Sequence, residues 1–261
     1  MLFRSNHYDR IPGFLAELIG RRVAVIAMAG STPGAVAAKS MNSPIPVVFS
    51  VAGDPVQLGL VASLNRPGGN VTGVTSLNQE VAPKRLELMH ELLPSVNSMA
   101  LLVNPAVPAT AEPVSRSSQA AAQALGLKLH TVHASSDRDF DAVFERLTQL
   151  RVGALVIGPD TFFTSRSGQL AKLTVRHEMP AIYQFREFAR AGGLMSYSSS
   201  EPEYYRLVGA YAGRVLKGDK PADLPVQQST KVELFLNLKT AKALGITVPL
   251  PLSGRADEVI E

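Results

Sequence analysis

The segment from Pro46 to Gly73, PVVFSVAGDPVQLGLVASLNRPGGNVTG, is the part of the chain that best defines the fold. It begins with an apolar run, PVVFSV, that is typical of a buried strand, and this strand ends at an acidic corner, Gly53-Asp54-Pro55. A short apolar helical turn, a loop rich in glycine and a second β-prone run, VTGVTS, follow. Because ligands bind beyond the carboxyl ends of strands in an open α/β sheet, we expect Asp54 to form one wall of a ligand cleft.

The rest of the chain alternates between apolar β-prone runs and amphipathic helical patterns. Between residues 99 and 183 the predicted order is β-α-β-α-β-α-β, which indicates a parallel sheet with right-handed crossovers. The tail, residues 255–261, is predicted to be a last half-helix. The predicted helices span 8–20, 33–41, 80–93, 109–125, 139–150, 165–177, 201–216 and 238–244, and the predicted strands span 22–29, 46–51, 71–76, 99–103, 128–133, 154–157, 181–183, 193–197 and 231–236.

The composition is that of a globular protein. The chain has 261 residues, of which 46% are hydrophobic and 18% charged, enough for one large domain or two lobes. The net charge of +4 comes from scattered basic residues with no cluster longer than Arg21-Arg22, so we expect no nucleic-acid partner. The absence of cysteine excludes disulfides, thiolate metal sites and cysteine nucleophiles. No apolar run reaches the ~20 residues of a membrane span, so direct membrane insertion is not expected.

Motifs for nucleotide binding, hydrolysis and metal binding are absent from the sequence. It contains no Walker loop, no G-x-G-x-x-G after a strand and no G-x-S-x-G elbow, and its five histidines have no metal-site spacing. Asp54 and Asp160, each at the end of a predicted strand, could act as an acid/base pair, but carboxylates in such positions also bind ligand ammonium groups. Since no nucleophile or cofactor motif accompanies them, we predict a binding protein rather than an enzyme, with no cofactor.

Several long segments of the sequence, in order, carry a family likeness. They are FSVAGDPVQLGLVASLNRPGGNVTGVTSLNQEVAPKRLELMHELLP (49–94), LLVNP (101–105), GPDTFFTSR (158–166), AIYQFREFARAGGLMSYSSS (181–200) and GRVLKGDKPADLPVQQSTKVELFLNLKTAKALGITVP (213–249). These segments resemble the solute-binding proteins of bacterial ABC transporters. The branch they resemble includes binders of tryptophan and other aromatic amino acids. The likeness covers nearly all of the chain from Tyr8 onward.

The resemblance implies the periplasmic binding protein type I fold, in which two doubly wound, parallel-sheet α/β lobes are joined by three hinge strands. The first lobe would contain residues 1–94 and 199–226, and the second 95–198 and 227–261. The chain would cross between lobes near Pro94, Ser198 and Gln227.

The same resemblance implies a monomeric solute-binding component of an ABC import system. It would close on an amino acid or a related small molecule, aromatic ones included, and deliver it to the permease membrane subunits. Two alternatives remain open at this point: a cytoplasmic small-molecule sensor with the same two-lobe core, and a two-lobed α/β enzyme such as a racemase or isomerase. The absence of cysteine excludes the two-cysteine racemase chemistry.

The beginning of the sequence departs from the family pattern. Family members begin with a signal peptide, then a strand, a helix and a second strand before the helix that matches residues 8–20. The N-terminus here, MLFRSNHYDRIPG, has no apolar signal region. The sequence therefore predicts a first lobe that lacks its first βαβ unit and exposes an apolar sheet edge. The expected location is periplasmic by resemblance, and cytoplasmic if Met1 is the genuine start.

A free amino acid needs donors for its carboxylate, acceptors for its ammonium group and an apolar slot for its side chain. Ser31 and Thr32, at the start of the helix 33–41, are the predicted carboxylate donors, because a helix N-terminus attracts anions. Asp54 is the predicted ammonium acceptor. The other candidates stand at strand ends or beside a crossing, and the aromatic ones would stack on a planar ligand: Thr75, Ser76, Asn104, Asp160, Phe162, Tyr183, Gln184 and Tyr197.

Each candidate also has a plainer interpretation. Ser31 and Thr32 would be an ordinary helix cap, and Asp54 before a proline would start a turn. Asp160 would cap the helix that follows it. Phe162 would belong to the core, and Tyr197 to lobe packing. Lys84 and Arg85 are predicted to lie on a solvated helix face.

Overall fold

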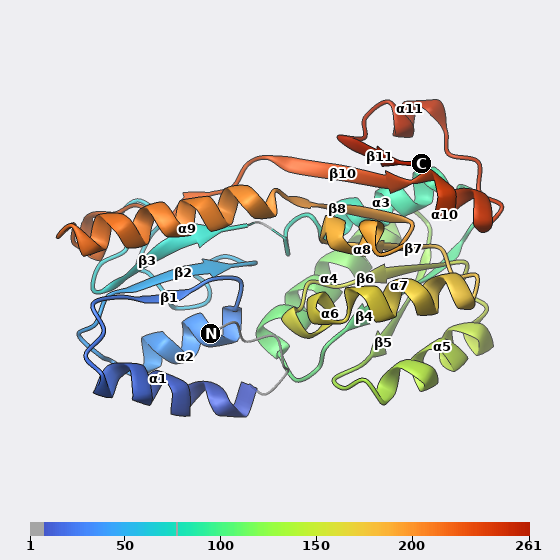
Figure 1. The fold of residues 1–261 in the computed structure, drawn as a ribbon. Helices are drawn as coiled ribbons and strands as arrows, with labels where there is room; N and C mark the ends of the chain where they lie inside the picture. The colour runs from blue at the N-terminus through green and yellow to red at the C-terminus, as the bar shows by residue number, and fades with distance from the viewer. Residues whose placement is uncertain (1–7, 77) are drawn as a thin grey trace. The chain divides into compact units, whose positions relative to one another are not determined.

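The computed structural model describes residues 8–76 and 78–261. Residues 1–7 and 77 lie outside the described residues, and with them His7 and the beginning of the first expected lobe. Contacts between the described residues divide the chain into two compact units (Figure 1). We call them the four-strand unit (residues 8–76 and 199–231) and the seven-strand unit (residues 78–198 and 232–261), after the sheet that each one contains.

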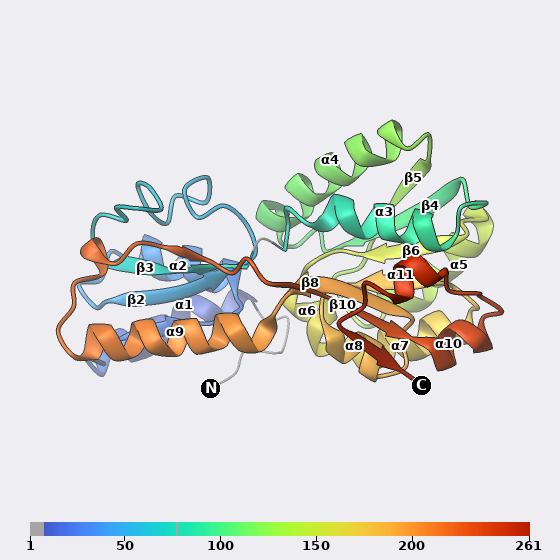
Figure 2. The same cartoon turned by 90° about the horizontal axis from the view of Figure 1, so that it is seen from above.

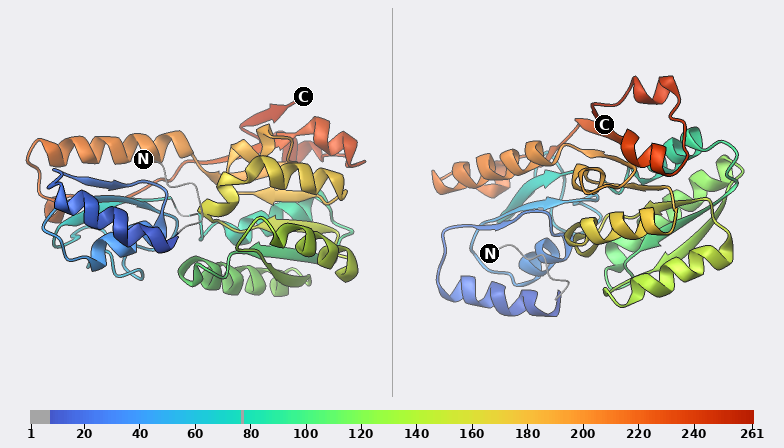
Figure 3. Two further views of the ribbon diagram at one scale, coloured as in Figure 1. Left: turned by 60° about the horizontal axis from the view of Figure 1, so that its bottom comes forward. Right: turned by 45° about the vertical axis from the view of Figure 1, so that its right-hand side comes forward.

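The four-strand unit is built on a sheet of parallel neighbours in the order β1-β2-β3-β9. Helices α1 and α2 lie on one side of it and α9 on the other (Figures 1 and 3). Every residue of β2 and β3 is buried, as their apolar sequences predict. The elements are η1 (Tyr8–Arg10), α1 (Ile11–Gly20), β1 (Ile26–Met28), α2 (Thr32–Ser40), β2 (Val47–Val51), β3 (Val71–Thr75), α9 (Glu201–Leu216), η2 (Pro221–Asp223) and β9 (Gln227–Gln228).

The seven-strand unit has the strand order β11-β10-β8-β7-β6-β4-β5. Strands β5, β4, β6 and β7 are parallel neighbours, which confirms the predicted β-α-β-α-β-α-β order. The elements are α3 (Ala82–Leu92), β4 (Ser98–Val103), α4 (Pro108–Ala124), β5 (Lys128–His133), α5 (Asp139–Leu150), β6 (Ala154–Ile157), α6 (Thr161–Ser165), α7 (Ser167–Arg176), β7 (Ala181–Tyr183), α8 (Arg186–Arg190), β8 (Met195–Ser199), β10 (Val232–Asn237), α10 (Leu238–Ala243), α11 (Leu250–Ser253) and β11 (Glu258–Ile260).

Two apolar cores cover the two faces of this sheet. On one face, Leu101 of β4 packs with α3 and α4, and on the other Leu102 packs with α5, α6 and α7. Successive side chains of a strand point to opposite faces, so neighbouring leucines enter different cores. Figure 2 shows α3 and α4 on one side of the sheet and α7 and α8 on the other.

The structure differs from the predicted elements in several places, and the short helices α8 and α11 were not predicted at all. The strand expected over 22–29 is limited to β1, because Arg22 has a left-handed backbone conformation (φ 52°) that ends the preceding turn. The expected helix 165–177 corresponds to α7, and a separate short helix that was not predicted, α6, precedes it and meets it at Arg166. The short helical turn expected directly after the Gly53-Asp54-Pro55 corner is not a helix, because the chain forms turns there. The tail is not a half-helix: β11 extends the sheet beside β10, with Leu236 opposite Val259.

The contacts also place the boundaries between units differently from the sequence. Helix α3 was expected in the first lobe, but its residues Leu86 and Met89 bury against Met99 and Leu101 of β4. The first boundary therefore falls between residues 77 and 78, and the third between 231 and 232. The second, between 198 and 199, lies where the crossing near Ser198 was expected. An amphipathic helix shows that it has an apolar face but not which sheet covers it.

Candidate functional site

In the seven-strand unit, polar side chains lie at the carboxyl ends of three strands. Asn104 follows β4, Asp160 follows β6, and Gln184 follows β7. Strand β4 is the neighbour of β6, and β6 is the neighbour of β7, so these ends meet at one edge of the sheet. The structure thus brings together three of the residues predicted from sequence.

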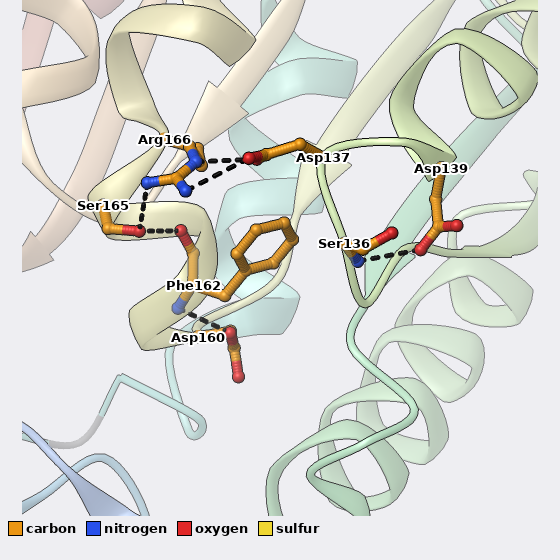
Figure 4. A network of polar contacts seen from close by, with 7 residues as sticks. All are labelled: Ser136, Asp137, Asp139, Asp160, Phe162, Ser165 and Arg166. Carbon is orange, nitrogen blue, oxygen red and sulfur yellow. Dashed lines mark hydrogen bonds and ion pairs between the residues drawn. The ribbon is translucent and has the colours of Figure 1, made fainter. Parts of the chain in front are cut away.

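Asp160 is held by two hydrogen bonds to one oxygen. The Asn104 side chain donates Nδ2–H to Asp160 Oδ1 at 3.2 Å. The Phe162 backbone N–H donates to the same atom at 2.8 Å, as Figure 4 shows. The second bond makes Asp160 the N-cap of α6, as the plainer interpretation predicted. The residue retains 9% of its exposure, so it is positioned rather than mobile. A cap and a ligand acceptor are compatible roles for one carboxylate, because it has two oxygens.

Tyr183 connects Asp160 to Gln184. Its hydroxyl lies 3.0 Å from Thr164 Oγ1 and 3.3 Å from both the Asp160 carbonyl and Gln184 Nε2. The ring is fully buried, and burial raises the pKa of the hydroxyl, which therefore stays neutral. With no exposed ring face, Tyr183 orients its neighbours instead of stacking on a ligand, contrary to our expectation. Thr164 was not predicted, although its position one helical turn after Asp160 is a detectable signal.

Phe162 belongs to the core, as the plainer interpretation held. Its ring is 2% exposed and stacks on Phe140 with a centroid distance of 5.4 Å. The guanidinium of Arg166 lies over the same ring at 5.9 Å and forms a 2.6 Å ion pair with Asp137 (Figure 4). The ring is therefore covered by protein, which does not support the stacking role predicted for it. The arrangement anchors α6 and Asp160 to the loop before α5.

A small hollow adjoins Asn104 and Asp160. Its volume is about 180 Å³, solvent at its mouth included. Its polar lining consists of Asn104 and Asp160 at the strand ends and of Thr110 in the first turns of α4. The lining residues are Val103, Asn104, Thr110, Ala111, Val114, Gly158, Pro159 and Asp160.

In the four-strand unit, the predicted residues also gather at the carboxyl ends of the strands. Ser31 Oγ accepts from Gly34 N at 3.1 Å and caps α2, which is the plainer role predicted for it. Thr32 Oγ1 accepts from Ala52 N at 3.4 Å. The second bond ties the start of α2 to the residue directly after β2.

Asp54 and the end of β3 complete this edge. Asp54 Oδ1 accepts from Val56 N at 2.8 Å, which is the turn that its plainer interpretation predicted. Thr75 Oγ1 donates to Gly53 O at 3.1 Å, and Ser76 Oγ donates to Val51 O at 3.3 Å. Asp54 stays partly exposed, so its carboxylate is accessible from solvent.

Tyr205 is an addition that the sequence did not suggest. It lies in the first turns of α9 and retains 37% exposure, with its ring 4.6 Å from that of Tyr204. A Cβ added at Gly30 would lie 3.2 Å from the Tyr205 hydroxyl. Gly30, which has φ 75°, therefore lets this ring approach the loop that carries Ser31. The pairing of α9 with the end of β1 has no local signal in the sequence.

Arg85 and Tyr197 are in contact. Tyr197 is partly buried against the α3 side of the sheet, in agreement with a packing role, and its carbonyl accepts from Arg85 Nε at 2.7 Å. Arg85 is fully buried, so the prediction that it lies on a solvated face is wrong. The Lys84 side chain beside it is 44% exposed, in agreement with the predicted solvated face, and it forms an ion pair with Glu87 at 2.7 Å that was not predicted.

The described residues contain no group of three or more acidic or histidine side chains that could hold a metal ion. None of the helices formed by residues 8–76 and 78–261 is long and apolar enough to cross a membrane.

Two α/β units with parallel sheets, each with polar side chains at the carboxyl ends of its strands, define the class of periplasmic binding proteins of type I. The family model described as ABC transporter substrate binding protein matches residues 9–260, and the chain belongs to this family.

Three relatives illustrate the match. The tyrosine-binding protein of Clostridioides difficile (strain R20291) is 27% identical over 227 residues, which are 82% of this chain and 61% of that protein. This chain thus spans less than two thirds of the length of that relative. The crystal structure of a conserved domain protein from Vibrio cholerae has a TM-score of 0.87 at 25% identity and covers 97% of this chain and 84% of its own. An ABC domain from Streptococcus pneumonia in complex with L-Trp has a TM-score of 0.84 at 27% identity, and the match covers 97% of this chain and 86% of that chain.

Proposed function

We propose that the protein binds a free aromatic amino acid as the solute-binding component of an ABC import system. The observation that carries the proposal is the hydrogen-bonded group Asn104–Asp160–Tyr183–Gln184 at the carboxyl edge of one sheet. Such an edge is where ligands bind in open α/β sheets. The choice of an aromatic ligand is supported by two relatives, one called a tyrosine-binding protein and one solved with L-Trp.

Each part of an amino acid has a candidate partner of the right chemistry. The carboxylates of Asp160 and Asp54 suit the ammonium group, and the N-terminus of α2 with Ser31 suits the carboxylate. The partly exposed rings of Tyr197 and Tyr205 suit an aromatic side chain. No chemical step is part of this proposal.

The proposed mechanism is a closure of the two units on the ligand. Each unit contributes one set of polar strand ends, and a ligand that contacts both sets favours the closed state by its differential affinity. The closed, loaded protein would then be recognised by the permease subunits of the transporter, on the periplasmic side of the membrane.

Fluorescence offers a direct test. The chain contains no tryptophan, so emission excited selectively at tryptophan reports only added L-Trp. We expect saturable changes in L-Trp emission on titration with protein, and competition by L-Tyr and L-Phe but not by L-Lys. Thermal unfolding should show stabilisation of about 2.7 kcal/mol at a ligand concentration about 100 times Kd. If no aromatic amino acid binds or stabilises the protein, the proposed ligand class is wrong.

A further inference from the structure

Arg85 is a fully buried cation in the first turn of α3. Its guanidinium makes three hydrogen bonds: Nε to Tyr197 O at 2.7 Å, Nη1 to Asn78 O at 3.1 Å and Nη2 to Asn78 Oδ1 at 3.4 Å. One planar group thus binds two segments that lie far apart in the sequence. Arginine suits this task because its donors form a rigid fork.

The two segments belong to two of the three places where the chain crosses between the units. The first boundary lies between residues 77 and 78, and Asn78 is the first residue of the seven-strand unit. The second boundary lies directly after Ser198, so Tyr197 is the last residue but one before it. Arg85 therefore binds the chain near the first and the second crossing at the same time, whereas the third crossing, between residues 231 and 232, is not among its contacts.

General packing does not explain a charge at this place. Burial lowers the pKa of Arg85 to about 10, so the group is still a cation at neutral pH. Its hydrogen-bond partners among the described residues are two carbonyls and one amide oxygen, and no carboxylate is among them. A buried cation held only by neutral acceptors costs stability compared with an apolar side chain of similar size. What offsets this cost is that the three hydrogen bonds of the guanidinium fix the positions of the two segments relative to each other.

We propose that Arg85 is a positioning residue for ligand binding, which fixes the ends of the two connecting segments in the seven-strand unit. At these two crossings, any change of backbone conformation is then confined to residues on the far side of Asn78 and Tyr197. The binding part of this inference rests on the proposed function, whereas the fixing of the segments does not.

The physical consequence is a lower ordering cost on ligand binding. Fixing a backbone segment costs conformational entropy, so two loosened segment ends would have to be ordered again whenever the ligand binds. Loss of the guanidinium should therefore weaken binding of L-Trp by roughly tenfold.

The test uses four variants of the full chain. Arg85→Met removes the fork and keeps apolar volume, and Arg85→Lys keeps the charge without the fork. Leu86→Ala, at the neighbouring buried position of the same helix, is the control for general destabilisation, and Lys84→Met controls for charge. Amide hydrogen exchange is measured over residues 78–81 and 195–199 and over β4 and β6, and L-Trp affinity is measured by ligand fluorescence.

We expect Arg85→Met to raise amide hydrogen exchange in both connecting segments together. Exchange in β4 and β6 should be no faster than in Leu86→Ala. The Kd for L-Trp should be roughly tenfold higher than in that control. Arg85→Lys should show the same pattern to a smaller extent, and it decides the question if Arg85→Met does not fold. The inference would be overturned if hydrogen exchange rose uniformly, as in Leu86→Ala, or if it rose in one segment only. It would also be overturned if the affinity for L-Trp did not change. If the wild-type protein binds no aromatic amino acid, the proposed function fails, and the exchange data alone then decide whether Arg85 fixes the segments.

Discussion

Asn104 and Asp160, 56 positions apart in the chain, are joined by a 3.2 Å hydrogen bond between Nδ2 and Oδ1. The bond crosses from the end of β4 to the end of β6, which are neighbours in the sheet with Leu102 opposite Ile157. The Asn104 side chain also accepts from Ala106 N at 3.0 Å through Oδ1, so its amide is oriented on both sides. Asp160 is therefore presented in one orientation before any ligand arrives, which reduces the entropy cost of binding.

The charge of Asp160 can be separated from its capping role. Asparagine is about as good an N-cap as aspartate, so Asp160→Asn should change stability by less than about 1 kcal/mol. The variant loses the carboxylate proposed to bind the ligand ammonium group, and we expect Kd for L-Trp to rise at least about tenfold, since hydrogen bonds to charged groups contribute about 1.5–3 kcal/mol. Calorimetric titration and thermal unfolding measure the two effects. Unchanged affinity in Asp160→Asn would show that Asp160 is only a helix cap.

Tyr205 should matter for aromatic ligands. Aromatic pairs contribute about 0.5–1.5 kcal/mol beyond area burial, so Tyr205→Ala should weaken L-Trp binding by about 2- to 13-fold, while Tyr205→Phe keeps the ring and most of the affinity. Leu216→Ala, an exposed apolar position at the other end of α9, is the matched control. Equal affinities for Tyr205→Ala and Leu216→Ala would remove Tyr205 from the site.

Gly73 is required by the close approach of two strands. It pairs with Phe49, and a Cβ at this position would overlap the Phe49 backbone. Because a neighbouring strand cannot yield as a flexible side chain would, Gly73→Ala should destabilise the protein by about 1–3 kcal/mol or more. Gly209, inside α9, has open space at its Cβ, and Gly209→Ala should stabilise by up to about 1 kcal/mol. Denaturant unfolding of both variants gives the comparison, and equal effects would contradict it.

Asp139 makes stability depend on pH in the acidic range. Hydrogen bonds from Ser135 N at 2.7 Å and Ser136 N at 2.8 Å lower its pKa below the ordinary value of 3.8. A lowered pKa in the folded state means that the stabilisation is fully present above the unfolded pKa and is lost as pH falls through the folded value.

Asp139→Asn should therefore lower the free energy of unfolding at neutral pH by about 1 kcal/mol, a modest value because the group is partly exposed. In this variant the free energy of unfolding should also decline less steeply below about pH 4 than in the wild type. Asp141→Asn, in the same helical turn, has the same charge change without these bonds and is the control. A parallel decline with pH in wild type and Asp139→Asn would refute this role.

Much of the fold was predictable because its signals are local. The periodicity of apolar residues predicted α5 over Asp139–Leu150 and β6 over Ala154–Ile157 with their observed bounds. Polar residues that follow apolar strands placed Asn104 and Asp160 at strand ends. That these two strands are neighbours was shown only by the structure.

Other features depend on which segments pack together, and no local pattern contains that information. Arg85 and Lys84 are adjacent charged residues of one helix, yet only packing against β8 decides that the first is buried and the second exposed. The tail is a strand because the edge of β10 is there to pair with it. Tyr205 approaches Gly30 because α9 crosses the four-strand sheet. The sequence alone thus determined the periods of apolar residues and the polar residues at the strand ends. The tertiary structure decided the burial of Arg85, the pairing of the tail with β10 and the contact between Tyr205 and Gly30, because these depend on long-range packing.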